Sequence, residues 1–267
     1  MRFALAAGLI LALSAASPAL AADGDPYPLK TPPQGWSFEG PFGKYNEADL
    51  QHGFQVYKEV CSACHSLNRV AFHTLSEPGG PGFSDAQMKA IAGSYKVLAG
   101  PDDKGDTVDD KGNPLTRAGT PADTFPPPFP NEEAARAANG GALPPDLSLI
   151  EKARAGGPNY IYSLMTGFHE TPPKGFAVTA NKYFNPYFIG WDISMPPPLA
   201  DGQVTFVDGA PNKIADEAYA VANFLAWTSE PHLDDRHRIG VGVMLFLIVL
   251  SGLLYLSYRR VWKDEAH

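Results

Sequence analysis

The sequence is poor in cysteine and in strand signals. Only two of its 267 residues are cysteines, Cys61 and Cys64, so no second pair is present to complete a four-cysteine zinc site. No internal repeat is visible and alternating apolar runs are few, whereas Pro and Gly contribute 26 residues each. A chain of this composition must contain much loop. We therefore expect a mainly α-helical, loop-rich protein.

Basic residues are also scarce in the part of the chain that we expect to be exported. Residues 22–238 contain 17 Lys and Arg against 27 Asp and Glu, a net charge of −10. Such a charge argues against nucleic acid as a partner. It suits a cationic protein partner, although acidic surfaces also serve solubility alone.

Charge is absent from two apolar segments near the chain ends. Residues 3–13 follow Arg2 and lead to the small residues Ala19 and Ala21, the pattern of a secretory signal peptide cut after residue 21. Residues 239–258 carry no charge and, as a helix, would be about 30 Å long, which matches the hydrocarbon core of a bilayer. We expect a signal peptide (1–21), an exported domain (22–238), a transmembrane helix (239–258) and a short cytoplasmic tail (259–267).

Several segments of the exported domain show helical signals. Asn46 can cap a helix that continues through both cysteines, with Leu50, Phe54 and Tyr57 on its apolar face. Pro158 suits the first turn of another helix, and Asp216 can cap the last helix of the domain, which ends before Pro231. Shorter helices are expected at 85–92, at 131–139 and from Asp146, whereas residues 23–43 are expected to be extended.

The motif Cys61-Ser62-Ala63-Cys64-His65 has four candidate uses. A disulfide within a helix would have poor geometry, a zinc site lacks ligands, and a thiol redox pair is usually preceded by a βαβ pattern that is missing here. Covalent haem attachment uses all three residues, because two thioether links lie one turn apart and the adjacent histidine becomes an axial ligand. Export agrees with this use. The sequence therefore predicts one covalently bound haem c.

The second axial ligand decides between electron transfer and ligand chemistry at the iron. Met195 is followed by Pro196, Pro197 and Pro198, which favour a stiff, extended loop that can present a sulfur. Met165 suits core packing, and the other histidines suit the surface. These residues favour Met195, and they leave open an unliganded position that would permit ligand binding or peroxidase activity.

Longer stretches of the chain closely resemble the cytochrome c1 family. The resemblance is carried by "GFQVYKEVCSACHS", "ARAANGGALPPDLS", "YFNPYF", "MPPPL" and "FLAWTSEP", together with the C-terminal apolar segment. It implies a class I-like cytochrome c haem domain with long loop insertions and one C-terminal transmembrane helix. Unlike several bacterial relatives, this chain lacks an extra cysteine pair before the methionine, so packing and prolines must hold residues 166–194.

The resemblance also implies a set of site residues. Cys61 and Cys64 would carry the haem, His65 and Met195 would bind its iron, and Arg154 would support a haem propionate. The remaining pocket residues that it implies are Asn139, Ala142, Pro144, Pro145, Tyr160, Leu164, Phe188 and Ile193.

The implied function is electron transfer within the quinol:cytochrome c oxidoreductase complex. The resemblance implies cytochrome b and the Rieske iron–sulfur protein as partners in a dimeric complex in the bacterial inner membrane. The haem domain would face the periplasm and pass electrons to a soluble or membrane-tethered c-type cytochrome. The alternatives are a free-standing membrane-anchored cytochrome that relays electrons to an oxidase, and a haem peroxidase or sensor. We further hypothesise that the acidic segment 102–110 steers a cationic cytochrome c.

Overall fold

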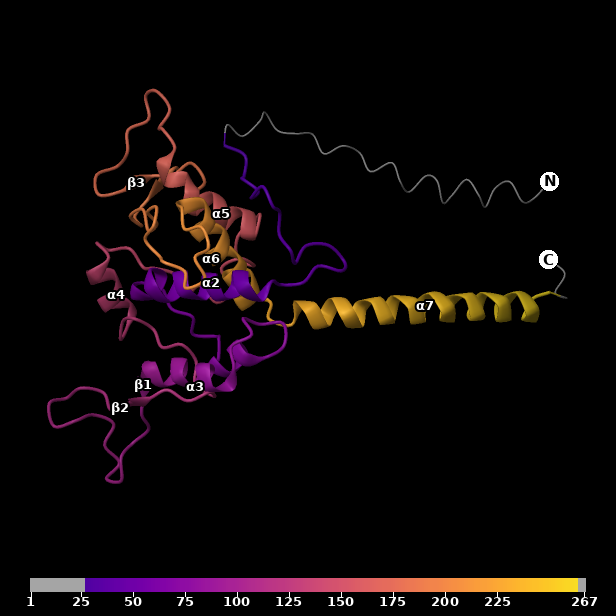
Figure 1. The fold of residues 1–267 in the computed structure, drawn as a ribbon, viewed down its shortest axis with the longest axis horizontal. Helices are drawn as coiled ribbons and strands as arrows, with labels where there is room; N and C mark the ends of the chain where they lie inside the picture. Colours follow the sequence, from indigo (N-terminus) through magenta and orange to yellow (C-terminus); the bar gives the residue numbers. More distant parts are fainter. Residues whose placement is uncertain (1–26, 264–267) are drawn as a thin grey trace.

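The computed structural model describes residues 27–263. The expected signal peptide and the last four residues of the expected tail lie outside this range. Residues 27–232 form a helical body, and the long helix α7 (Leu233–Val261) projects from it (Figure 1). The mainly α-helical class is confirmed, with short strands limited in the described residues to two two-stranded sheets.

Helices α2 (Glu47–Glu59) and α6 (Ile214–Ser229) cross at the centre of the body. They approach closely at Gly53, where an added Cβ would lie 2.1 Å from the Ala220 carbonyl oxygen. Phe54 and Tyr57 of α2 pack on Phe224 of α6, with ring centroids 5.7 and 5.9 Å apart. The core is therefore centred on this crossing, and α5 (Pro158–Thr166) packs on α6 beside it.

The start of α2 is as predicted, but its end is not. The Asn46 side chain accepts hydrogen bonds from the amides of Ala48 and Asp49. The α-helix ends at Glu59, however, and Cys61–Ala63 form a 3-10 turn, η2. The prediction that one continuous helical face carries the apolar residues and both cysteines was therefore wrong. Cys61 packs against the core, whereas Cys64 is exposed.

The last helix of the body begins two residues earlier than the predicted cap. Helix α6 starts at Ile214, and Asp216 occupies its third position, where its carboxylate accepts the Lys213 N–H. This carboxylate still satisfies a free amide at the helix start. Nearly all of α6 beyond its first turn is buried, because α2 and α5 cover it on different sides.

A second lobe follows the cysteine segment. The 3-10 helix η3 (Phe72–Ser76) packs on α3 (Asp85–Ser94), which confirms the short helix expected at 85–92. Strands β1 (Lys96–Leu98) and β2 (Thr116–Ala118) then pair antiparallel, with Val97 opposite Arg117. The acidic segment 102–110 lies in their connection, where residues 101–110 are all exposed.

Helix α4 (Glu132–Ala138) agrees with the prediction, and Asn131 caps it. The helix expected from Asp146 does not form, because residues 148–157 make a series of turns. The Asp146 side chain bonds to a distant segment, and Gly156 and Gly157 have positive φ angles of 90° and 51°. A new helix can therefore begin only at Pro158.

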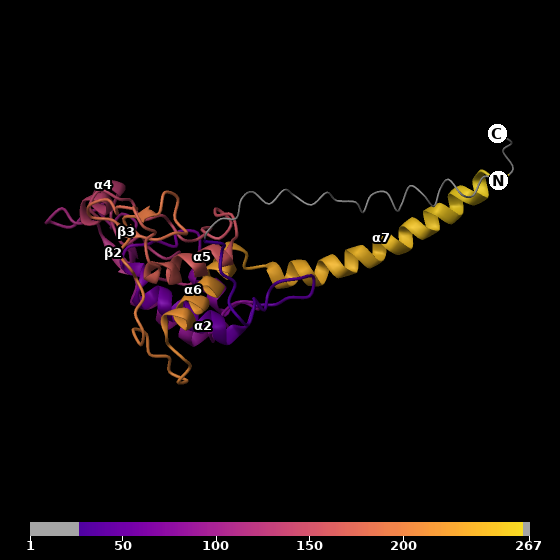
Figure 2. The ribbon, with the colours of Figure 1, turned by 90° about the horizontal axis from the view of Figure 1, so that it is seen from above.

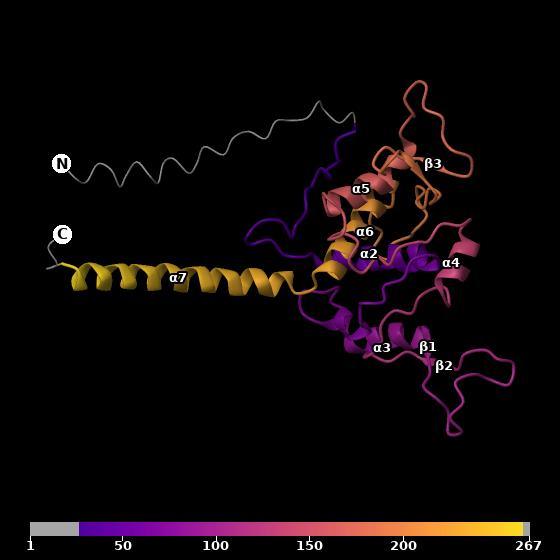
Figure 3. The same cartoon turned by 180° about the vertical axis from the view of Figure 1, so that it is seen from behind.

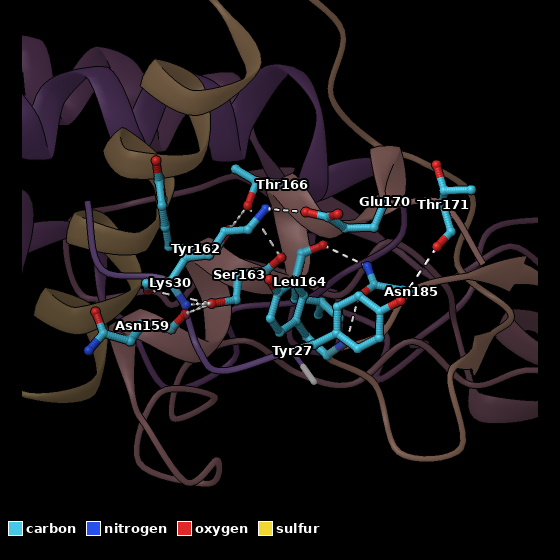
Figure 4. Close-up of polar contacts among 11 residues, drawn as sticks. Tyr27, Lys30, Asn159, Tyr162, Ser163, Leu164, Thr166, Glu170, Thr171 and Asn185 are labelled. Carbon is cyan, nitrogen blue, oxygen red and sulfur yellow. Dashed lines mark hydrogen bonds and ion pairs between the residues drawn. The ribbon is translucent and has the colours of Figure 1, made fainter. Parts of the chain in front are cut away.

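The segment after α5 runs through η4 (Gly167–His169) to the paired strands β3 (Tyr183–Phe184) and β4 (Asp192–Ile193). The extended N-terminal segment lies against this region (Figure 4). The Lys30 amide donates to Ser163 Oγ at 2.7 Å, and Lys30 Nζ pairs with Glu170 Oε1 at 2.7 Å. Lys30 thereby joins the N-terminal segment to α5 and to the residue that follows η4.

Helix α7 is 29 residues long and contains the whole predicted span, 239–258. Among the described residues it is the only helix long and apolar enough to cross a membrane, and none of its apolar window is buried. Figure 2 shows α7 projecting away from the body. Helix α4 and strand β3 lie at the end of the body opposite α7 (Figures 1 and 3). Both elements are thus remote from the membrane helix.

Candidate haem site

The cysteine motif lies directly after the C-terminal end of α2. The Cys64 and His65 amides both donate to the Cys61 carbonyl, at 3.1 and 2.9 Å, which winds the motif into a tight turn. Burial raises the pKa of the Cys61 thiol to about 12, and the neighbouring Cys64 adds to the effect. Redox-active thiols instead have a lowered pKa, typically at a helix N-terminus or beside a cation. The environment of Cys61 therefore argues against a thiol redox pair.

His65 is oriented by a backbone carbonyl from a distant segment. Its Nδ1 lies 2.8 Å from the Pro145 carbonyl oxygen, so Nδ1–H donates and Nε2 keeps its lone pair. Burial lowers the pKa of His65 and outweighs the opposing effects of the Pro145 hydrogen bond and Asp146. A neutral imidazole whose second nitrogen is fixed in this way has the form that binds metals.

Asp146 holds the Pro145 segment against the cysteine motif. Its Oδ2 accepts the Ser66 hydroxyl and the Asn68 amide at 2.7 and 2.8 Å, and its Oδ1 accepts the Ser148 amide at 2.9 Å. Burial acts to raise the pKa of Asp146, but these hydrogen bonds outweigh it and the net shift is downward. This role was not predicted from the sequence, where Asp146 was expected only to begin a short helix.

Met195 lies two residues after β4 and is half-buried. The β3–β4 hairpin that leads to it is held by side chains that the sequence analysis did not identify. The buried Asn185 donates to the Leu164 carbonyl at 2.8 Å, and its own oxygen accepts the Tyr187 amide at 3.1 Å. An aromatic cluster surrounds the hairpin, with centroid distances of 5.5 to 6.5 Å among Tyr27, Phe176, Phe184, Tyr187 and Trp191.

The other predicted site residues differ in exposure. Leu164 and Ile193 are buried, whereas Pro145 and Arg154 are exposed. An Arg154 N–H donates to the adjacent Ala153 carbonyl, and the Asn139 amide donates to the Ala135 carbonyl at the end of α4. Among the predicted site residues, His65 and Pro145 are joined by a hydrogen bond. The remaining predicted residues are half-buried: Asn139, Ala142, Pro144, Tyr160 and Phe188.

These residues fit a covalently bound haem. Two free thiols, one exposed and one against the core, lie next to an imidazole with an available nitrogen. No group of three or more His, Cys, Asp or Glu side chains that could hold a bare metal ion occurs among the described residues. A macrocycle that brings its own nitrogen ligands needs no such group.

Comparison with known proteins decides the family. The model of the Cytochrome C1 family matches residues 36–265. The chain belongs to the cytochrome c1 family. Cytochrome c1 from Rhodospirillum rubrum is 45% identical over 281 residues, covering 100% of this chain and 98% of that protein. The mitochondrial cytochrome c1 haem protein from Kluyveromyces lactis is 46% identical over 237 residues, 89% of this chain and 76% of that protein.

A longer relative shows the same match over part of its length. The protein named cytochrome b/c1 from Bradyrhizobium diazoefficiens is 47% identical over 254 residues. These residues are 88% of this chain but only 36% of that protein. Cytochrome c1 is the haem-bearing electron-transfer subunit of the cytochrome bc1 complex, alongside cytochrome b and the Rieske protein. The chain accordingly carries one covalent haem c and is a single-pass membrane protein.

Proposed function

We propose that Cys61 and Cys64 form the thioether links to the haem, and that His65 and Met195 are its axial ligands. The observation that carries this assignment is the 2.8 Å hydrogen bond from His65 Nδ1 to the Pro145 carbonyl. It fixes the tautomer and orientation of an imidazole whose Nε2 can bind iron. The resemblance supplies Met195, and its half-buried position before three prolines is compatible with a sulfur ligand.

The pocket residues would exclude water from this site and orient the macrocycle. Leu164 and Ile193 are already buried, and the half-buried Ala142, Pro144, Tyr160 and Phe188 offer apolar surface that a flat ring would cover. Asn139, the C-cap of α4, would lie at the edge of this surface. The exposed Arg154 would turn its guanidinium to a propionate, a charge-assisted hydrogen bond.

The bound haem would supply a one-electron carrier between the Rieske protein and a c-type cytochrome. The protein chain would hold this carrier at a fixed place relative to the membrane. Helix α7 would anchor the body in the bacterial inner membrane, with the body in the periplasm and the C-terminus in the cytoplasm. The proposed site would be near α4 and β3, at the end of the body opposite α7 (Figure 3), where a soluble or membrane-tethered cytochrome could approach. The complex would be dimeric, as the family resemblance implies.

Purification from membranes tests this proposal. We expect the tagged chain, solubilised in mild detergent, to bring down cytochrome b and an iron–sulfur protein. On a denaturing gel it should keep a haem stain, which the matched Cys61→Ser, Cys64→Ser double variant should lose. A stained chain without partner subunits would indicate a free-standing carrier. A wild-type chain without stain would contradict covalent attachment.

A further inference from the structure

Residues 37–44 form a tight loop next to the start of α7. The Lys44 amide donates to the Ser37 carbonyl at 3.0 Å, and Gly43 donates to Gly40 at 3.3 Å. Gly40 has a φ of +82°, and a Cβ at Gly43 would lie 2.3 Å from the Glu39 oxygen. The loop therefore requires both glycines and has one defined shape.

The two phenylalanines of the loop differ in exposure. Phe38 is 6% exposed and packs on Trp36 and Tyr45, with centroids 5.7 and 5.0 Å apart. Phe42, at the tip, is 74% exposed. One exposed phenylalanine is ordinary on a soluble surface. Phe42 differs from such a residue because it lies next to the membrane helix α7.

The loop is fixed to α7. His237 Nδ1–H donates to the Gly43 carbonyl at 2.8 Å, and the Tyr45 amide donates to Asp234 Oδ1 at 3.2 Å. All three ribbon views place the indigo loop beside the first turns of α7 (Figures 1, 2 and 3). Phe42 cannot move away from the helix without breaking these contacts.

Phe42 also lies between two surface hollows that reach the membrane helix. Pro41 and Phe42 line the first hollow together with six residues of α7: Arg236, His237, Gly240, Val241, Met244 and Leu245. They line the second with Gly43, the exposed Lys44, Pro78 and Gly79, and with five residues of α7: Asp234, Asp235, His237, Arg238 and Val241. Met244 is six residues beyond Arg238, the last charged residue before the span, or about 9 Å along the helix axis. The first hollow therefore extends to the depth of hydrocarbon.

We propose that the loop 37–44 is a second membrane contact of this chain. Pro41 and Phe42 enter the phospholipid interface on the side of the body, and Lys44 faces the lipid phosphates. Three observations favour lipid as the occupant. The hollow is continuous with a helix that spans the bilayer, its lining is apolar except for Arg236 and His237, and aromatic and basic residues are typical of this depth. The loop would fix the tilt of the body relative to α7.

Spin labelling of the haem-loaded full chain in vesicles of phosphatidylcholine and phosphatidylglycerol tests this proposal. If both native cysteines carry haem, as we propose, then Phe42→Cys introduces the only free thiol. The matched control is Leu98→Cys, because Leu98 is 71% exposed and lies in β1, far from α7 (Figure 1). Val241→Cys, within α7, reports the bilayer.

We expect a nitroxide at residue 42 to collide with oxygen as one at residue 241 does, and to lose collisions with a water-soluble nickel chelate. A nitroxide at residue 98 should do the reverse. If the label at residue 42 collides with nickel as freely as that at residue 98, the loop does not contact lipid. Protection from both reagents, seen only in the assembled complex, would show that a protein subunit covers Phe42 and would also overturn the proposal. Label uptake by the wild-type chain would contradict the thioether assignment instead.

Discussion

The His65 side and the Met195 side of the proposed site differ in how the chain holds them. On the His65 side, residues 144–148 are joined to residues 65–69 by directional hydrogen bonds through Pro145, Asp146 and Ser148. On the Met195 side, a two-residue strand pair is surrounded by aromatic rings and followed by prolines. One side is positioned mainly by polar contacts and the other mainly by packing.

The two sides should therefore be sensitive to different substitutions. Hydrogen bonds to a carboxylate have defined directions and depend on its ionisation. Aromatic packing is less directional and depends on the volume that fills the site. Perturbations of charge should therefore act on the His65 side, and loss of apolar volume should act on the Met195 side.

Removal of a central ring should have the largest effect. Phe184 is 8% exposed and packs against both Phe176 and Trp191. Phe184→Ala should destabilise residues 176–195 by about 3–5 kcal/mol, since the space it leaves has no atoms to fill it. On heating, carbon monoxide binding to the haem should begin well below the loss of helical circular dichroism. Val178→Ala, at an exposed site in the same segment, should keep the two transitions together. Coincident transitions in Phe184→Ala would contradict a separately packed Met195 side.

Loss of the carboxylate at Asp146 should have a smaller effect, on the opposite side. Asp146→Asn keeps one acceptor oxygen but replaces the other with donors that face the Ser66 hydroxyl and the Asn68 amide. We expect a loss of about 1–3 kcal/mol in the free energy of unfolding. Because Asp146 is half-exposed, the lower end of this range is expected. Denaturant unfolding monitored by the haem spectrum measures it, and Asp103→Asn, in the exposed acidic segment, is the control. Equal stability of both variants would exclude a role for Asp146.

The pH dependence should follow the same carboxylate. The folded pKa of Asp146 is lowered, so its ionisation stabilises the fold above its unfolded pKa of about 3.9. This stabilisation is lost as the pH falls through the lower, folded pKa. In acid titrations from pH 6 downward, the Asp146→Asn variant should therefore lose less stability than the wild type below pH ~4. Parallel curves for the two proteins would show that another group dominates.

The smallest effect should come from the acidic segment, which belongs to neither side. Its residues are exposed, and Asp102 and Asp109 accept hydrogen bonds from amides of their own turns. Replacement of Asp103, Asp106 and Asp110 by Asn should leave stability unchanged. It should reduce the rate of reduction of a cationic cytochrome c by a few-fold at low ionic strength and flatten its salt dependence. An unchanged slope would discard the steering hypothesis.

Local signals predicted much of the fold. Asn46 and Pro158 begin helices as expected, because capping and the fixed φ of proline act within one turn. The helix expected from Asp146 failed because that side chain bonds to residues about 80 positions away. No local pattern contains such a contact.

The site was predictable to a similar extent. The motif from Cys61 to His65 indicates the attachment chemistry, because residue spacing alone sets it. The support provided by Asn185 and Asp146 was missed, since their partners become neighbours only in the folded chain. The Leu164 carbonyl, in the last turn of α5, has no partner within the helix and accepts the Asn185 side-chain amide instead. No sequence pattern indicates which residue will fill this role.

The central claim is that a sulfur from the packed side and an imidazole from the hydrogen-bonded side bind the same iron. Absorption spectroscopy and redox titration of Met195→Leu test it most directly, with Met165→Leu as the matched control. We predict that Met195→Leu abolishes the far-red absorption band of methionine-bound ferric haem. Its midpoint potential should change by roughly 0.1 V or more, within the ~0.8 V range that axial ligands span. If Met195→Leu keeps the band and the potential of the wild type, Met195 is not the ligand and the account is wrong.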